Sequence, residues 1–122
     1  MLVTHLDACS EFVAADGSLL RELLHPGKQP AQIRYSLAHA KVSLRQKTSP
    51  HRLKSCEVYY VLAGRGMMHI DREARSVGPG DTICIPPASV QSIENVGDTD
   101  LVFLCIVDPP WRPQDEELLQ KP

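Results

Sequence analysis

The sequence predicts an all-β fold, either a sandwich or a barrel, and three observations carry this prediction. Residues 33–37 alternate apolar and polar side chains, which is the period of a strand with one buried face. Turn signals made of glycine, proline and aspartate recur about every 8–12 residues, as they do in sandwiches and barrels. Ten of the 122 residues are proline, above the usual frequency of about 5%, and this indicates many short elements.

Apolar runs between the turn signals define the predicted strands in the middle and at the end of the chain. These strands are predicted at residues 33–44, 57–63, 67–70, 82–85, 90–94 and 101–107. Gly64 and Gly66 separate the second run from the third, which predicts a β-hairpin between them. Residues 101–107 are apolar throughout, so this strand is predicted to be buried on both of its faces.

The two ends of the chain allow fewer firm assignments. Residues 1–6 have the composition of an edge strand. Residues 18–24 place four leucines on one helical face, with Asp16 as a candidate cap, and equally suit a strand that follows a turn at Gly17. Residues 113–119 predict one helical turn with acidic residues near its N-terminal end.

Length and composition limit the classes of protein that the chain can represent. With 122 residues we expect a single domain over residues 1–122. Thirteen basic and fifteen acidic residues give a net charge of −2, which argues against nucleic acid or an anionic membrane as a partner. No apolar run approaches the ~18 residues of a membrane span, and the first residues lack the pattern of a signal peptide. Four scattered cysteines, without a C-x-x-C pair, predict a reduced, cytoplasmic protein.

Residues 45–95 resemble the two sequence motifs of the cupin family. The first motif contains His-x-His, a glutamate and a closing glycine, and the second contains a glycine, Pro-x-Gly, a histidine and an asparagine. Six residues stand at the matching spacing, namely His51, Glu57, Gly64, Gly80, Pro86 and Asn95. The resemblance implies a double-stranded β-helix (jelly-roll) cupin barrel, with short N-terminal strands and a C-terminal tail.

Four positions depart from the cupin motifs. Arg45 and Ala88 stand where the motifs have glycine. Leu53 stands at the second histidine of the first motif, and Gln91 stands at the histidine of the second motif. Leucine has no donor atom for a metal, so these departures concern chemistry more than fold.

The resemblance implies a metal site, because cupins typically hold a divalent ion on the histidines and the glutamate of these motifs. Carried over residue by residue, the site would consist of His51, Glu57 and Gln91. This mixed nitrogen and oxygen set would take Mn, Fe, Zn, Ni or Cu and would leave positions open for water or substrate. Glu57 could alternatively act as a catalytic base, and in either role it needs a partner, because an isolated buried carboxylate is costly.

Strand parity selects further residues for the cavity of the barrel. Tyr59 shares a strand face with Glu57, since residues i and i+2 point the same way. Phe103 and Cys105 share a face of the last strand and are expected to line the cavity, with a packed core thiol as the alternative for Cys105. His39 lies on the preceding strand and either faces the cavity or takes a structural, hydrogen-bonded role.

Two functions follow from the resemblance. The first is a metal-dependent enzyme, of the dioxygenase or isomerase type, that acts on a small organic molecule. The second is a non-catalytic cupin that binds a sugar, a small acid or another metabolite beside a degenerate metal site. Leu53 and Gln91, which replace two expected histidines, favour the second function. Family resemblance also implies a homodimer, in which the N-terminal strands pair with a second copy.

Overall fold

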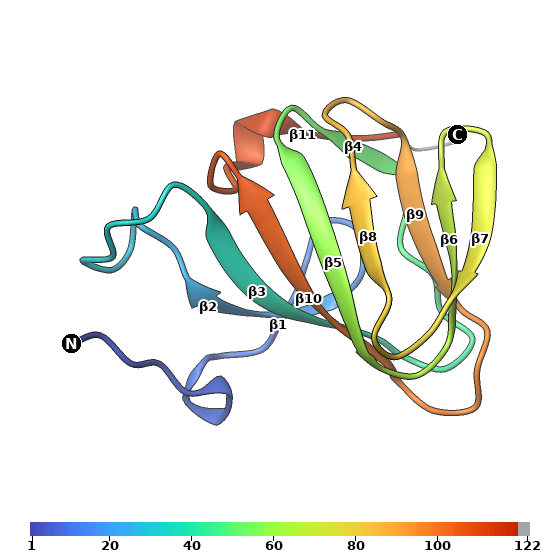
Figure 1. The fold of residues 1–122 in the computed structure, drawn as a ribbon, viewed down its shortest axis with the longest axis horizontal. Coiled ribbons are helices and arrows are strands. Elements are labelled where there is room, and N and C mark those ends of the chain that lie inside the picture. Colours follow the sequence, from blue (N-terminus) through green and yellow to red (C-terminus); the bar gives the residue numbers. More distant parts are fainter. Residues whose placement is uncertain (120–122) are drawn as a thin grey trace.

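Two antiparallel β-sheets pack face to face around one core (Figure 1). The structure is a computed structural model that describes residues 1–119. Within these residues, six strands form the first sheet in the order β1-β2-β3-β10-β5-β8, and five form the second in the order β11-β4-β9-β6-β7. This arrangement is a jelly-roll β-barrel, and it confirms the predicted fold class.

The strands are short and lie close to most of the predicted apolar runs. Those of the first sheet are β1 (Phe12–Val13), β2 (Leu19–Leu24), β3 (Ser36–Val42), β10 (Leu101–Asp108), β5 (Cys56–Ala63) and β8 (Thr82–Ile85). Those of the second sheet are β11 (Glu116–Leu118), β4 (His51–Leu53), β9 (Gln91–Asn95), β6 (Gly66–Ile70) and β7 (Glu73–Val77). Two short 3₁₀ helices, η1 (Leu6–Ala8) and η2 (Pro113–Asp115), complete the elements. Residues 1–119 include no helix with the length and apolar character needed to span a membrane.

The core lies between the sheets and is formed by alternate residues of their strands. On β10, Leu101, Phe103, Cys105 and Val107 are at most 7% exposed, whereas the residues between them are half-buried. β10 is therefore buried on one face, and the prediction that both faces of residues 101–107 are buried is wrong. The outer face of β10 is half-buried, at Val102, Leu104 and Ile106.

β5 and β6 lie in different sheets, so the predicted hairpin between residues 57–63 and 67–70 is wrong. β5 pairs with β10 and β8, while β6 pairs with β7 and β9. The connection turns at Gly64, which has a φ of +86° and leaves no room for a side chain, because a Cβ would collide with the carbonyl oxygen of Asp100. The glycines do mark a sharp turn, but that turn carries the chain from one sheet to the other.

The ends of the chain differ from the prediction in two places. Residues 1–6 form no strand, and Arg21 of β2 holds this segment by donating hydrogen bonds to the carbonyl oxygens of Leu6 and Cys9. Residues 18–24, which suit a helix or a strand, form β2 between β1 and β3. Residues 113–119 contain η2 and then β11, which pairs with β4 and brings the tail into the second sheet.

Candidate functional site

A cavity of about 170 Å³ opens between the sheets, where β2, β3 and β10 face β4 and β11. Its walls include apolar side chains from both sheets, such as Leu20, Leu53 and Trp111. Eight polar or ionisable side chains also line it, and these are Asp16, Glu22, Lys28, Ser36, His51, Glu57, Cys105 and Glu116. Buried titratable groups are thus concentrated at this one place in the fold, which makes it the candidate site.

Glu57 lies at the centre of this site, on the inner face of β5, and is only 5% exposed. Its Oε1 accepts a hydrogen bond from Nε2 of Gln91 at 2.8 Å, and its Oε2 accepts one from Sγ of Cys105 at 2.7 Å. Burial raises the pKa of the Glu57 carboxyl, and these two hydrogen bonds oppose that rise in part. Glu57 is therefore a carboxyl group whose protonation is sensitive to what enters the cavity.

Gln91 uses both ends of its side-chain amide within the protein. While its Nε2 donates to Glu57, its Oε1 accepts a hydrogen bond from the hydroxyl of Tyr59 at 3.0 Å. Burial raises the pKa of Tyr59 well above its ordinary value, so the hydroxyl remains a donor. The Tyr59 ring is held against Phe103, with ring centroids 4.3 Å apart. The result is a buried chain of hydrogen bonds, Tyr59 to Gln91 to Glu57.

His51 enters the cavity from β4 and faces a carboxylate that the sequence motifs do not include. Its Nδ1 lies 2.8 Å from the carbonyl oxygen of Ser49, which can only accept, so Nδ1 carries the hydrogen. Its Nε2 lies 3.7 Å from Oδ2 of Asp16. The other oxygen of Asp16 accepts from the backbone N–H and the hydroxyl of Ser18, which fixes the direction of the carboxylate.

Glu116 and Trp111 complete the cavity from the C-terminal tail. The indole Nε1 of Trp111 donates to Oε1 of Glu116 at 3.3 Å, and Nε2 of His25 lies 2.8 Å from the Trp111 carbonyl oxygen. Partial burial raises the pKa of Glu116. Neither acidic residue belongs to the cupin motifs, and the sequence predicts Asp16 only as a helix cap and residues 113–119 only as a helical turn. The Asp-Gly-Ser sequence, with its turn at Gly17, is the signal that could have indicated Asp16.

Most of the residues selected from the sequence lie together, and one does not. His51, Glu57, Gln91, Tyr59, Phe103 and Cys105 are all buried in or beside the cavity. His39 was a candidate for the cavity, but it lies on the opposite face of β3, between buried Ala40 and half-buried Ala38 on the inner face. Burial lowers the pKa of His39, as do Arg21 and Lys41 beside it. Strand parity is the reason, because Ala38 and Ala40 already occupy the inner face of β3.

The side chains of the site do not converge as a three-ligand metal centre. Leu53, at 3% exposure, occupies the cavity wall where the motif has its second histidine. The amide oxygen of Gln91 accepts from Tyr59, and its nitrogen points at Glu57. Within residues 1–119, no group of three His, Cys, Asp or Glu side chains is placed to hold an ion. His51 and Glu57 thus remain from the implied set, each with a partner in the protein.

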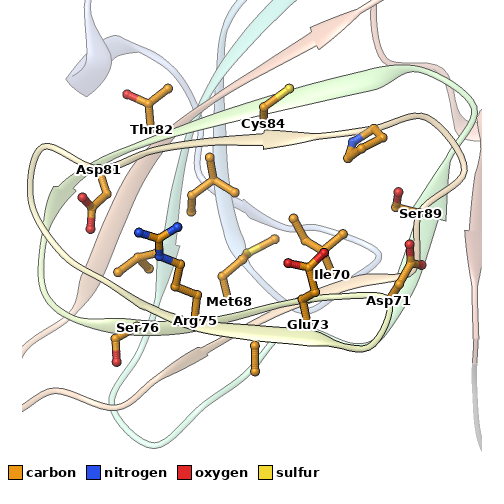
Figure 2. Close-up of a pocket in the computed structure, with 14 residues that line it drawn as sticks. Met68, Ile70, Asp71, Glu73, Arg75, Ser76, Asp81, Thr82, Cys84 and Ser89 are labelled. Carbon is orange, nitrogen blue, oxygen red and sulfur yellow. The ribbon is translucent and has the colours of Figure 1, made fainter.

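A second, larger hollow of about 500 Å³ lies between the free edges of the sheets, along β7 and β8 (Figure 2). Figure 2 shows Glu73 and Arg75 projecting from β7 toward β8, with Met68 and Ile70 of β6 behind them. Pro86 of the second motif lines this hollow, but none of the candidate metal, catalytic or cavity residues does. Its ionisable groups are exposed, so it lacks the buried, hydrogen-bonded acid that distinguishes the smaller cavity.

Comparison with known proteins identifies the family. The cupin domain family matches residues 41–107, which are more than half of the chain. The chain therefore belongs to the cupin family. Both the fold and the resemblance of residues 45–95 are accounted for by this membership.

Individual relatives cover the chain to different extents. The uncharacterized protein MJ1618 of Methanocaldococcus jannaschii is 41% identical over 121 residues, which are 98% of this chain and 96% of that protein. An oxalate-binding protein of Thermotoga maritima is 37% identical over 51 residues, 42% of each chain. The polyketide cyclase RemF of Streptomyces resistomycificus has a similar structure, with a TM-score of 0.82 and 21% identity over 100% of this chain and 87% of that one. The last of these shows the fold alone.

Proposed function

We propose that this chain binds a small organic molecule in the cavity between the sheets, and that Glu57 exchanges a proton with it. The observation that carries the proposal is the hydrogen bond from Gln91 to Glu57 at 2.8 Å. At this position the family motif has a histidine that can bind a metal, whereas the amide here orients a carboxyl group. A buried carboxyl with a raised pKa is suited to general acid or base catalysis near neutral pH.

The size of the cavity supports a ligand of few atoms. Its volume of about 170 Å³ is below the ~300–1,000 Å³ of sites for drug-sized molecules. Apolar walls with a few polar groups at one end are typical of such sites. Glu57 and His51 lie on neighbouring walls, so one bound molecule can contact both groups.

We also propose that two copies associate through the N-terminal part of the first sheet. β1 is the edge strand of that sheet, and both of its residues, Phe12 and Val13, are exposed. A second copy would pair the free edge and cover these side chains. Light scattering coupled to size-exclusion chromatography tests this: a Phe12→Asp, Val13→Asp variant should elute as a monomer, whereas wild-type protein should elute as a dimer.

Four free thiols support a reducing, cytoplasmic setting for the protein.

The first experiment measures metal content and ligand binding on the same preparation. Protein is purified without a histidine tag or chelator, and mass spectrometry determines bound metal in the wild type and in Glu57→Gln. The proposal expects well under one ion per chain in both. Near one divalent ion per wild-type chain, lost in the variant, would favour the alternative of a metal-dependent dioxygenase or isomerase with His51 and Glu57 as ligands.

Ligand binding is followed with Trp111, the only tryptophan in the chain. Because Trp111 lines the cavity, its fluorescence and its indole N–H resonance report on occupancy. A screen of small metabolites should find molecules that change both signals and raise the melting temperature. These effects should weaken in Glu57→Gln. A hit that binds Glu57→Gln as tightly as wild type would show that Glu57 does not contact the ligand.

A further inference from the structure

The cavity described above is lined by more acidic than basic groups. Four carboxyl groups line it, from Asp16, Glu22, Glu57 and Glu116. Among its lining residues, Lys28 is the only lysine or arginine, and its ammonium lies 2.7 Å from Glu22, so its charge is balanced within the protein. No arginine lines the cavity among the described residues. The space beside His51 is therefore lined by carboxyl groups and, in the part of the chain that the structure describes, by no unpaired lysine or arginine.

From this charge distribution we infer that the cavity selects small molecules that carry hydroxyl or amine donors and no negative charge. The inference rests on the proposed function, since it concerns the ligand of the same site. The ligands expected in the cavity are small polyols and amines, and dicarboxylates are excluded. The preference would be set by side chains that the family motifs do not contain.

Hydrogen-bonding capacity points to the same class as charge does. An ionised carboxylate only accepts hydrogen bonds. Asp16 and Glu116 therefore offer acceptors to the cavity, and a ligand must supply the donors. Asp16 keeps this orientation because Ser18 holds its other oxygen at 2.7 Å.

The cavity offers mainly acceptors, and a dicarboxylate also offers only acceptors. Its oxygens would need cationic or N–H donors, since burying an unpaired charge costs much of its hydration. Asp16 and Glu116 would repel it at short range, in a cavity where screening by salt is weak. Lys28 is the only lysine or arginine among the lining residues that the structure describes, and its side chain is 64% exposed and already paired with Glu22.

Three probes with the same four-carbon chain test the inference: 1,4-diaminobutane, 1,4-butanediol and succinate. Each is titrated into the full-length protein at constant ionic strength, and the indole N–H resonance of Trp111 is followed. We expect the diamine and the diol to shift this resonance saturably, and succinate to bind at least tenfold more weakly than the diamine.

Two variants in β11, Glu116→Gln and Glu117→Gln, test whether the preference for the diamine arises in the cavity. In Glu116→Gln the affinity for the diamine should fall by about tenfold, because one charge-assisted contact is lost, whereas the diol should change by less than threefold. Glu117→Gln is the control, because Glu117 lies next in the same strand, is exposed, and pairs with Arg52 outside the cavity. This control should bind all three probes as the wild type does.

Different results would contradict the selection by charge and the binding of a ligand in the cavity. Succinate that binds within threefold of the diamine, and loses affinity in Glu57→Gln, would overturn the charge selection and leave the ligand cavity intact. A resonance of Trp111 that none of the three probes shifts would count against both the charge selection and the cavity as a ligand site.

Discussion

The side-chain amide of Gln91 donates to the carboxyl group of Glu57 across the interior of the barrel, at 2.8 Å. In the cupin motifs these two positions hold a histidine and a glutamate that share a metal ion. Here the two side chains bind one another directly, and Tyr59 fixes the amide from its other end. In this chain the two motif positions thus hold a hydrogen-bonded amide and carboxyl group.

Replacement of Gln91 by leucine should destabilise the fold. The variant leaves the carboxyl of Glu57 and the hydroxyl of Tyr59 without one buried partner each, and an unsatisfied buried polar group costs about 1–3 kcal/mol. We expect the free energy of unfolding in urea to fall by about 2–4 kcal/mol. Ser92→Ala, one residue along β9 on the outer face, is the control and should change it by less than about 0.5 kcal/mol. Equal effects of the two variants would mean that the hydrogen-bond chain contributes nothing to stability.

The raised pKa of Glu57 predicts how stability depends on pH. In the unfolded chain Glu57 ionises near its ordinary pKa of 4.5, whereas burial raises its pKa in the folded protein. Between these two pKa values the folded protein keeps a proton that the unfolded chain has released, so the free energy of unfolding falls as pH rises. The stabilisation is complete below pH 4.5 and is lost as pH passes the folded-state pKa.

Urea unfolding of wild type and Glu57→Gln, at several pH values from about 4.5 to 8, measures this dependence. The difference in stability between wild type and variant should shrink or reverse in sign as pH rises. Glu116 also has a raised pKa, but it is present in both proteins and cancels in the comparison. Parallel pH profiles would show that Glu57 ionises alike in the folded and unfolded chains.

The sequence predicts the centre of the site because the motif residues lie on strands that are neighbours in the barrel. His51 and Gln91 face one another across β4 and β9, and parity places Glu57 on the inner face of β5. Asp16 and Glu116 are different, because they reach the cavity from a turn and a tail far from the motifs. Their positions depend on tertiary contacts, such as the backbone hydrogen bond from Ser49 to Asp16 at 2.7 Å, which no local pattern reveals.

For the fold too, local sequence predicts the positions of most strands, whereas strand pairing depends on tertiary contacts. Alternating and apolar runs predict the positions of most strands. The partner of each strand depends on the core that the strand helps to form, and local sequence does not reveal it. The predicted hairpin between residues 57–63 and 67–70 is wrong for this reason. β7 was missed because Glu73–Val77 is polar and exposed along most of its length and lacks an apolar run. Edge strands of this kind contribute little to the core, so their sequences carry a weak strand signal.

Two substitutions should restore a metal site. Leu53 and Gln91 both point into the barrel, so histidines at these positions would join His51 and Glu57 in a set of three imidazoles and one carboxylate. We expect Leu53→His, Gln91→His protein to retain near one Zn²⁺, Ni²⁺ or Mn²⁺ per chain after dialysis, and the wild type to retain much less. Arg52→His, Gln91→His is the matched control, because Arg52 is on the outer face of β4 and 41% exposed. Metal retention by both double variants alike would show that position 53 does not face the site.

A single glycine should stabilise the protein at the position where the second motif has one. Ala88 has a φ of +66°, in the left-handed region that costs an L-residue about 1–2 kcal/mol. Glycine removes this strain but gains about 0.4–1 kcal/mol of conformational entropy in the unfolded chain, so Ala88→Gly should raise the free energy of unfolding by about 0.5–1 kcal/mol. Ala74→Gly, within β7, lacks the strain and should lower it by a similar amount. Thermal and urea unfolding of both variants decide the matter, since a loss of stability in Ala88→Gly would show that the left-handed turn carries no strain.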